Sequence, residues 1–294
     1  MGEEVKGTRV EPSIRTLTLT LIALVAFASN SLLTREALGA HEIDAASFTL
    51  VRLAAGAAVL AVVVRARAGS VRPAGGRALL GAAALFAYAA PFSFAYLRIG
   101  AAVGALVLFG VVQLTMIGYG IARGERPGTI AWLGLALAVF GLAALTVPAA
   151  SRPDPPGVAL MAVAGVAWGA YSLAGRKTLD PVAANARSFL WSVPLALVLA
   201  AVAHASAAAT AKGVGLALIS GGLTSGLGYA IWYRAVARLT VTQAAVAQLS
   251  VPVIAAAGAA ILLHERLGPR FVLSAAAILA GVSLVFAARY SERR

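Results

Sequence analysis

The amino-acid sequence predicts an all-α membrane protein, in which ten transmembrane helices form two inverted five-helix repeats around a central cavity. Apolar residues make up 61% of its 294 residues and charged residues only 12%, whereas a soluble domain carries about 25% charged residues. The apolar residues form ten blocks of about 20, each long enough to cross a hydrocarbon core of about 30 Å. The two halves of the chain also match each other when one is slid along the other.

Each apolar block is expected to be a helix, because lipid offers no hydrogen-bond partner to an unpaired backbone group. The first block follows Arg15 and could be taken for a signal peptide, but many more spans follow it, so we expect a retained first helix. Polar residues 1–13 and the last four residues are expected to be loose tails. The ten expected spans are 14–34, 46–64, 78–97, 99–122, 128–148, 157–176, 185–204, 213–233, 240–262 and 268–288.

The proline-rich run 151–157 divides the chain into two halves of nearly equal length. Charged and glycine positions of the halves coincide, which favours duplication over a shared apolar bias. We therefore expect a first repeat at 14–148 and a second at 157–288. A shift of 141 residues pairs Phe27 with Trp168, Ser31 with Ser172 and Arg35 with Arg176, and a shift of 140 pairs Arg98 with Arg238, Glu125 with Glu265 and Gly141 with Gly281.

Charge in the loops predicts the orientation. Of the 24 Lys and Arg residues, 17 fall on the side that holds the N-terminus, six fall on the other side, and Arg52 lies within a span. Cytoplasmic loops are the ones rich in Lys and Arg. We therefore expect a multi-pass protein of the inner (plasma) membrane with both termini in the cytoplasm. Five spans are an odd number, so the second repeat enters the bilayer inverted, a plan common in secondary transporters.

Several classes of function are disfavoured by what the sequence lacks. It has no cysteine, and none of its eleven carboxylates lies deep in a span, so we expect no metal, no cofactor and no catalytic residue. The net charge of +13 comes from short loops between spans rather than from a nucleic-acid-binding surface. A proton relay would use an intramembrane carboxylate or histidine, so transport without a proton gradient is expected. A membrane enzyme or a channel is a weaker alternative.

The candidate substrate-binding residues are amides, aromatic residues and one serine near the middle of spans. An amide in hydrocarbon must find a partner, so it faces either another helix or a cavity. Aromatic rings with polar tips suit a cavity that grips a flat or aliphatic molecule, although packing is an equally plain explanation for each. The candidates are Asn30, Tyr88, Phe92, Gln113, Trp168, Ser172, Tyr229, Trp232 and Gln248.

Three charged residues have two interpretations each. Arg52 could extend its stem toward the membrane surface and meet Asp44 or Glu42, or it could take part in outer gating. Glu125 and Glu265 each precede the last helix of a repeat, where a carboxylate is stabilised by the helix dipole; the alternative is a role in gating.

The sequence also resembles a known family. Leu249-Ser-Val-Pro-Val-Ile254, Leu262-Leu-His-Glu-Arg-Leu267 and Ala280-Gly-Val-Ser-Leu284 are similar to the end of an EamA domain, as is the weaker run Gly124-Glu-Arg-Pro127, and Val51-Arg52-Leu53 matches its second helix. EamA domains belong to the drug/metabolite transporter superfamily, and within it the chain resembles amino-acid exporters of the YddG type. The first half departs from the pattern, with Val112 where the second half has Pro252.

The resemblance implies ten helices, a central cavity and export of small metabolites. We therefore expect a secondary transporter that exports small amphipathic metabolites through alternating access. Amino acids with aromatic or other neutral side chains are the leading cargo, because a cavity for cations usually has a carboxylate; multidrug or other metabolite efflux is the alternative.

Overall fold

The computed structural model describes residues 12–67, 69, 75–99, 101–147, 154–176, 178–203, 209–263, 268–288 and 290–292. Ten helices in these ranges are long and apolar enough to cross a membrane, as the sequence predicts. Two of the ten are built from consecutive segments. The helices are α1 (Ile14–Gly39), α2 (Ala45–Ala66), α3 (Gly75–Tyr96), α4 (Ala101–Ala122), α5 (Thr129–Thr146), α6 (Pro155–Gly175), α7 (Pro181–Val202), α8–η2–α9 (Ala211–Ile219, Ser220–Leu227, Gly228–Val236), α10–η3–α11 (Val241–Ala247, Gln248–Ser250, Val251–Leu263) and α12 (Pro269–Ala287).

Helix ends follow capping residues more closely than hydropathy. Asp180 accepts hydrogen bonds from the backbone N–H groups of Val182 and Ala183, so α7 begins at Pro181, four residues before the predicted start. Helix α1 continues to Gly39, five residues past its predicted end. The prediction ended α1 just before Arg35, but a charge at the membrane surface does not interrupt the backbone hydrogen bonds of a helix.

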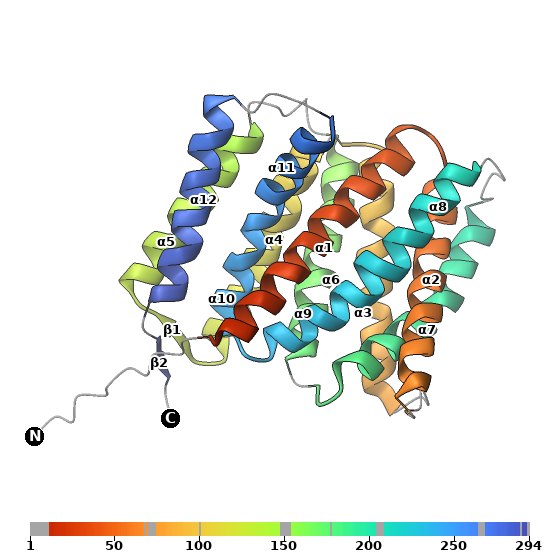
Figure 1. The fold of residues 1–294 in the computed structure, drawn as a ribbon, viewed down its shortest axis with the longest axis horizontal. Coiled ribbons are helices and arrows are strands. Elements are labelled where there is room, and N and C mark those ends of the chain that lie inside the picture. Colours follow the sequence, from red (N-terminus) through yellow and green to blue (C-terminus); the bar gives the residue numbers. More distant parts are fainter. Residues whose placement is uncertain are drawn as a thin grey trace, which may run out of the picture.

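Helices that the predicted repeat makes equivalent pack against each other across the molecule. Helix α2 lies on α7, α5 lies on α12, and α4 lies on α10 (Figure 1). In the pair α5–α12, a Cβ at Gly281 would lie 2.4 Å from the carbonyl oxygen of Gly134, so only glycine permits this approach. Pairing of equivalent helices is the contact pattern that a two-fold axis in the membrane plane produces.

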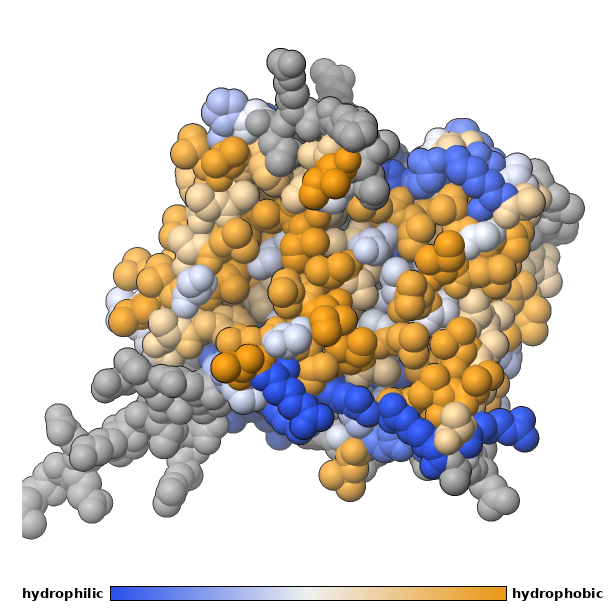
Figure 2. All heavy atoms as spheres, viewed as in Figure 1, coloured by the Kyte–Doolittle hydropathy of each residue, from blue (hydrophilic) through white to orange (hydrophobic). Residues whose placement is uncertain are grey.

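On the face that Figure 2 shows, a wide apolar belt lies between two polar edges. Exposed apolar side chains of the molecule include Leu114 and Phe140, which are 76% and 69% exposed. A soluble protein rarely exposes so large an apolar surface, whereas lipid covers it at no cost. Together with the ten helices, the belt identifies a multi-pass membrane protein.

The terminal face is the side at which α1 begins and α12 ends, and the opposite face is the side at which α1 ends (Figure 1). At the terminal face, β1 (Glu125–Pro127) pairs with β2 (Tyr290–Glu292) in antiparallel register. Two of the last four residues are therefore in a strand rather than a loose tail. Of the predicted N-terminal tail, residues 1–11 lie outside the described residues.

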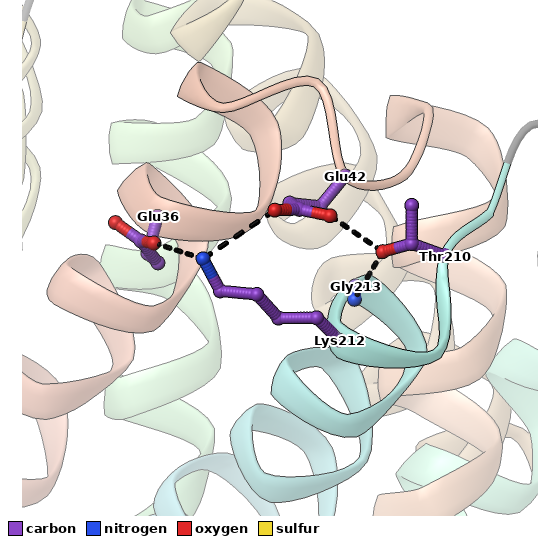
Figure 3. Close-up of polar contacts among 5 residues, drawn as sticks. All are labelled: Glu36, Glu42, Thr210, Lys212 and Gly213. Carbon is purple, nitrogen blue, oxygen red and sulfur yellow. Dashed lines mark hydrogen bonds and ion pairs between the residues drawn. The ribbon is translucent and has the colours of Figure 1, made fainter.

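At the opposite face, exposed ion pairs join the two halves of the chain. The Nζ of Lys212, in α8, lies 2.6 Å from Glu36 and 3.4 Å from Glu42, and the Thr210 hydroxyl donates to Glu42 (Figure 3). The Thr210 hydrogen bond and then Lys212 hold the pKa of Glu42 below its ordinary value. Arg98 likewise pairs with Asp154 at 2.7 Å. Exposed pairs of this kind add little stability each, so the helix packing holds the halves together.

Candidate functional site

The vestibule is a cavity of about 240 Å³ in the half of the molecule next to the opposite face. It lies between the first half of α4, with Leu108 and Phe109, and α11, with Ala255 and Ala256. These are equivalent helices of the predicted repeat. A volume just below the usual range for drug-sized ligands, about 300–1,000 Å³, suits a molecule the size of one amino acid.

The aromatic chamber is a smaller space, of about 20 Å³, that continues the vestibule inward and shares Ser31, Leu108, Phe109 and Val251 with it. A space of this size holds about one water molecule. Rings fill the rest, with centroids 4.7 Å apart for Trp168 and Tyr229 and 4.9 Å apart for Trp168 and Tyr88. The chamber walls are Phe27, Asn30, Tyr88, Phe92, Trp168 and Tyr229, together with the four shared residues.

A residue of α10–η3–α11 holds the indole of Trp168 in place. Its Nε1 donates a 2.6 Å hydrogen bond to the Oε1 of Gln248. Gln248 lies where the helix changes from α to 3-10 geometry, four residues before Pro252, which has no backbone N–H to donate to its carbonyl. The break in the helix therefore places an amide beside the chamber, where it orients the ring that forms much of the wall.

A polar cluster surrounds Asn30 at the other side of the chamber. The Oδ1 of Asn30 accepts from the Ser220 hydroxyl at 2.7 Å and lies 3.5 and 3.4 Å from the hydroxyls of Thr224 and Ser225. All three hydroxyls come from η2, an eight-residue stretch of π-helix. Wide π turns are rare and often mark functional sites, and here the widened turn directs a row of hydroxyls toward α1.

Five of the nine candidate residues line the chamber, and four lie behind its wall. Trp232 donates to the Ser172 hydroxyl at 3.0 Å, and both are buried. Gln113 donates to the Ala245 carbonyl at 2.8 Å, and Gln248 holds Trp168. The structure therefore places these four between helices, whereas the five that face the chamber are Asn30, Tyr88, Phe92, Trp168 and Tyr229.

Between the chamber and the terminal face, β1 and α4 contact α10. The Glu125 carboxylate accepts from the backbone N–H of Val241 at 2.6 Å and from both the N–H and the hydroxyl of Thr242, at 3.1 and 3.0 Å. The hydrogen bond from Gln113 to the Ala245 carbonyl joins α4 to α10 deeper in the membrane. Glu125 thus binds the N-terminus of α10, a helix of the other half. The sequence had suggested instead that it is stabilised by the N-terminus of the following helix, α5. The side chain of Glu265 lies outside the described residues.

Arg52 is not directed to the membrane surface. Its side chain is 1% exposed and donates from Nε to the Ser225 hydroxyl at 3.0 Å and from Nη2 to the Tyr229 hydroxyl at 2.6 Å. The predicted partners are occupied elsewhere, since Asp44 caps α2 and Glu42 pairs with Lys212. The expectation of an outward-reaching arginine is therefore wrong, because the inward face of α2 meets hydroxyls from η2 and α9.

The residues that line the vestibule and the chamber include one charged side chain, Arg35, and no carboxylate. In the part of the chain that the structure describes, no group of three or more His, Cys, Asp or Glu side chains could hold a metal ion. Aromatic rings, one buried amide and a cation at the mouth can bind a small amphipathic molecule by packing and hydrogen bonding. They offer no nucleophile with an adjacent base.

Phe27 is the main chamber residue that was not among the candidates. Its ring meets that of Trp168 edge to face, with centroids 5.1 Å apart. The sequence did contain an indication of its place, because the predicted repeat pairs Phe27 with Trp168 and equivalent residues near a two-fold axis lie close together.

Three comparisons with known proteins agree with this geometry. The sequence model of the EamA-like transporter family matches residues 155–287. An uncharacterized protein of Pseudomonas aeruginosa, PA1977, is 49% identical over 278 residues, which cover 95% of this chain and 96% of that protein. A crystal structure of another protein has the same fold, with a TM-score of 0.77 and 20% identity over 91% of this chain and 98% of that one.

Proposed function

Because the chain belongs to the EamA-like transporter family, whose members move small solutes across membranes, we propose that it exports small amphipathic metabolites, and specifically amino acids with aromatic or other neutral side chains. One observation supports this most strongly: the cavity in the half of the molecule next to the opposite face is continued inward by a chamber of aromatic rings with a buried amide. Rings grip an apolar side chain and the amide orients a polar head. Cationic drugs fit less well, since no carboxylate lines the cavity.

The contacts near the terminal face and the cavity near the opposite face support alternating access. Toward the terminal face, β1 and α4 contact α10 through Glu125 and Gln113, whereas toward the opposite face the vestibule lies between α4 and α11. If the contact moved to the vestibule end of these equivalent helices and the separation moved to the terminal end, the opposite face would close and the terminal face would open. In this proposal, the conformation is the one from which substrate leaves toward the opposite face.

The test is flux of labelled amino acids through proteoliposomes that contain the purified protein. We expect saturable counterflow of L-phenylalanine or another neutral amino acid, which persists when an ionophore collapses the proton gradient, because no carboxylate lines the cavity to carry a proton. Empty liposomes are the control. Absence of counterflow for every neutral amino acid contradicts the cargo, and flux that stops with the gradient contradicts the uncoupled mechanism.

We place the terminal face on the cytoplasmic side of the inner membrane, since this face holds 17 of the 24 Lys and Arg residues. The chain lacks cysteine, so single cysteines can report exposure to a membrane-impermeant maleimide. Leu179→Cys, at the terminal face, is expected to react only after cells are lysed, and Gly39→Cys, at the opposite face, in intact cells. The reverse pattern would invert the proposed orientation.

Trp168→Ala is expected to weaken substrate affinity by roughly three- to tenfold, because one ring contact contributes about 0.5–1.5 kcal/mol beyond its buried area. Half-saturation of counterflow measures the effect. Trp191→Ala is the matched control, since Trp191 is 37% exposed and lines neither cavity. Unchanged kinetics in Trp168→Ala would remove Trp168 from the binding site.

A further inference from the structure

Arg52 is a buried cation with an unused donor. Its guanidinium binds the hydroxyls of Ser225 and Tyr229 through Nε and Nη2, whereas Nη1 is buried and has no hydrogen-bond partner among the described residues. A buried guanidinium with an unpaired N–H is costly. An ionisable residue kept within a membrane helix despite this cost indicates a functional site.

No carboxylate in the described part of the chain compensates the charge of Arg52. Each carboxylate whose side chain the structure describes is engaged at a surface or at a helix start. Glu36 and Glu42 bind Lys212, Asp154 binds Arg98, Asp44 caps α2, Asp180 caps α7 and Glu125 caps α10. The partners of Arg52 are neutral hydroxyls and rings, so its positive charge is available to an anion.

The charge lies directly behind the wall of the aromatic chamber. The Cζ of Arg52 lies 5.4 Å from the ring centroid of Tyr88 and 5.7 Å from that of Phe92, and both rings line the chamber. Tyr229, which receives the Nη2 hydrogen bond, lines it as well. With Arg35 at the vestibule, two guanidiniums stand along the route, and a low-dielectric cavity concentrates their field.

We propose that Arg52 is the anion subsite of the substrate site, where its guanidinium binds the carboxylate of a zwitterionic or anionic substrate. The proposal rests on the proposed function, and it narrows the cargo to molecules with a carboxylate. The rings of Tyr88 and Phe92 turn aside to admit the carboxylate, which agrees with a ligand-free chamber of only about 20 Å³. The shift of 141 residues places Val193 at the equivalent position of the second half, so the second half supplies no counterpart of Arg52.

Two probes that differ only in charge test the proposal on the purified full-length protein. They are 3-phenylpropionate, which has the carboxylate, and 3-phenylpropionamide, which does not. We expect the carboxylate to raise the unfolding temperature of the wild-type protein and the amide to have little effect. In Arg52→Gln the dissociation constant for 3-phenylpropionate should rise by at least about 30-fold, because a buried anion loses its charged partner. Arg187→Gln, which removes an arginine of α7 that lines neither cavity, should bind like the wild type.

A second variant, Arg52→Met, guards against misfolding of Arg52→Gln, since apolar residues of similar size often replace buried charges without loss of stability. If either variant binds the carboxylate as tightly as the wild type does, or if the wild type does not distinguish the probes, the proposal is wrong. It is also wrong if neither variant folds, because Arg52 is then a structural tie between α2 and η2.

Flux measurements separate this proposal from the proposed function. Equal counterflow of L-phenylalanine and L-phenylalaninamide by the wild type would keep the transport function and reject the anion subsite. Carboxylate-dependent stabilisation that is lost in Arg52→Gln, without flux of any amino acid, would keep the anion subsite and reject amino acids as the cargo.

Discussion

Glu125→Ala is expected to shift the protein toward the state in which the terminal face is open, by about 10- to 150-fold in the ratio of the two states. The Glu125 carboxylate holds the backbone N–H groups of Val241 and Thr242 and the Thr242 hydroxyl. A hydrogen bond to a charged group contributes about 1.5–3 kcal/mol, and each 1.4 kcal/mol changes an equilibrium tenfold. These contacts join β1, which follows α4, to α10, so their loss destabilises the closed terminal face.

Accessibility of a single cysteine at Met116 measures this shift. Met116 is fully buried in α4 and contacts Gln248 across the closed interface. We expect Met116→Cys to react slowly with a maleimide supplied at the terminal face and much faster when combined with Glu125→Ala. Glu36→Ala, which removes a carboxylate from an exposed ion pair at the opposite face, is the control and should leave the rate unchanged. Equal reaction rates with and without the Glu125 side chain would show that its carboxylate does not stabilise the closed terminal face.

The sequence predicts the membrane spans well because hydropathy and length depend only on local composition. The predicted repeat pairs Phe27 with Trp168, whose rings the structure brings into contact, although Phe27 was not among the candidates. Candidates such as Tyr88 and Tyr229 line the chamber for a related reason: polar-tipped rings at mid-span have no favourable place in lipid.

The sequence does not predict which face of a helix a polar side chain occupies or which distant residue it meets. Arg52 lies about two turns inside α2, a depth from which the stem could reach the surface, and its actual partners lie in η2 and α9 of the other half. The partner of Glu125 is likewise more than 100 residues away. Gln113 and Trp232 were expected at the cavity, but each donates a hydrogen bond to a residue of a neighbouring helix instead.

The close approach of α2 to η2 makes Gly221 the position where a single methyl group should do the most damage. A Cβ there would lie 2.1 Å from the backbone carbonyl oxygen of Arg52 and 2.8 Å from its Cα. Neither atom can move without a shift of α2 itself. We expect Gly221→Ala to lower the free energy of unfolding by at least about 2 kcal/mol, at the upper end of overpacking effects, and to separate Arg52 from Ser225.

Thermal unfolding of the purified protein, monitored by intrinsic tryptophan fluorescence, measures the loss. Gly118→Ala is the matched control, because a Cβ at Gly118 in α4 meets no atom within 4 Å. That variant should unfold within about 0.5 kcal/mol of the wild type, since the site is open and alanine favours the helix. If both variants unfold alike, α2 and η2 are not packed backbone to backbone at Gly221, and the hydrogen bond from Arg52 to Ser225 does not depend on that glycine.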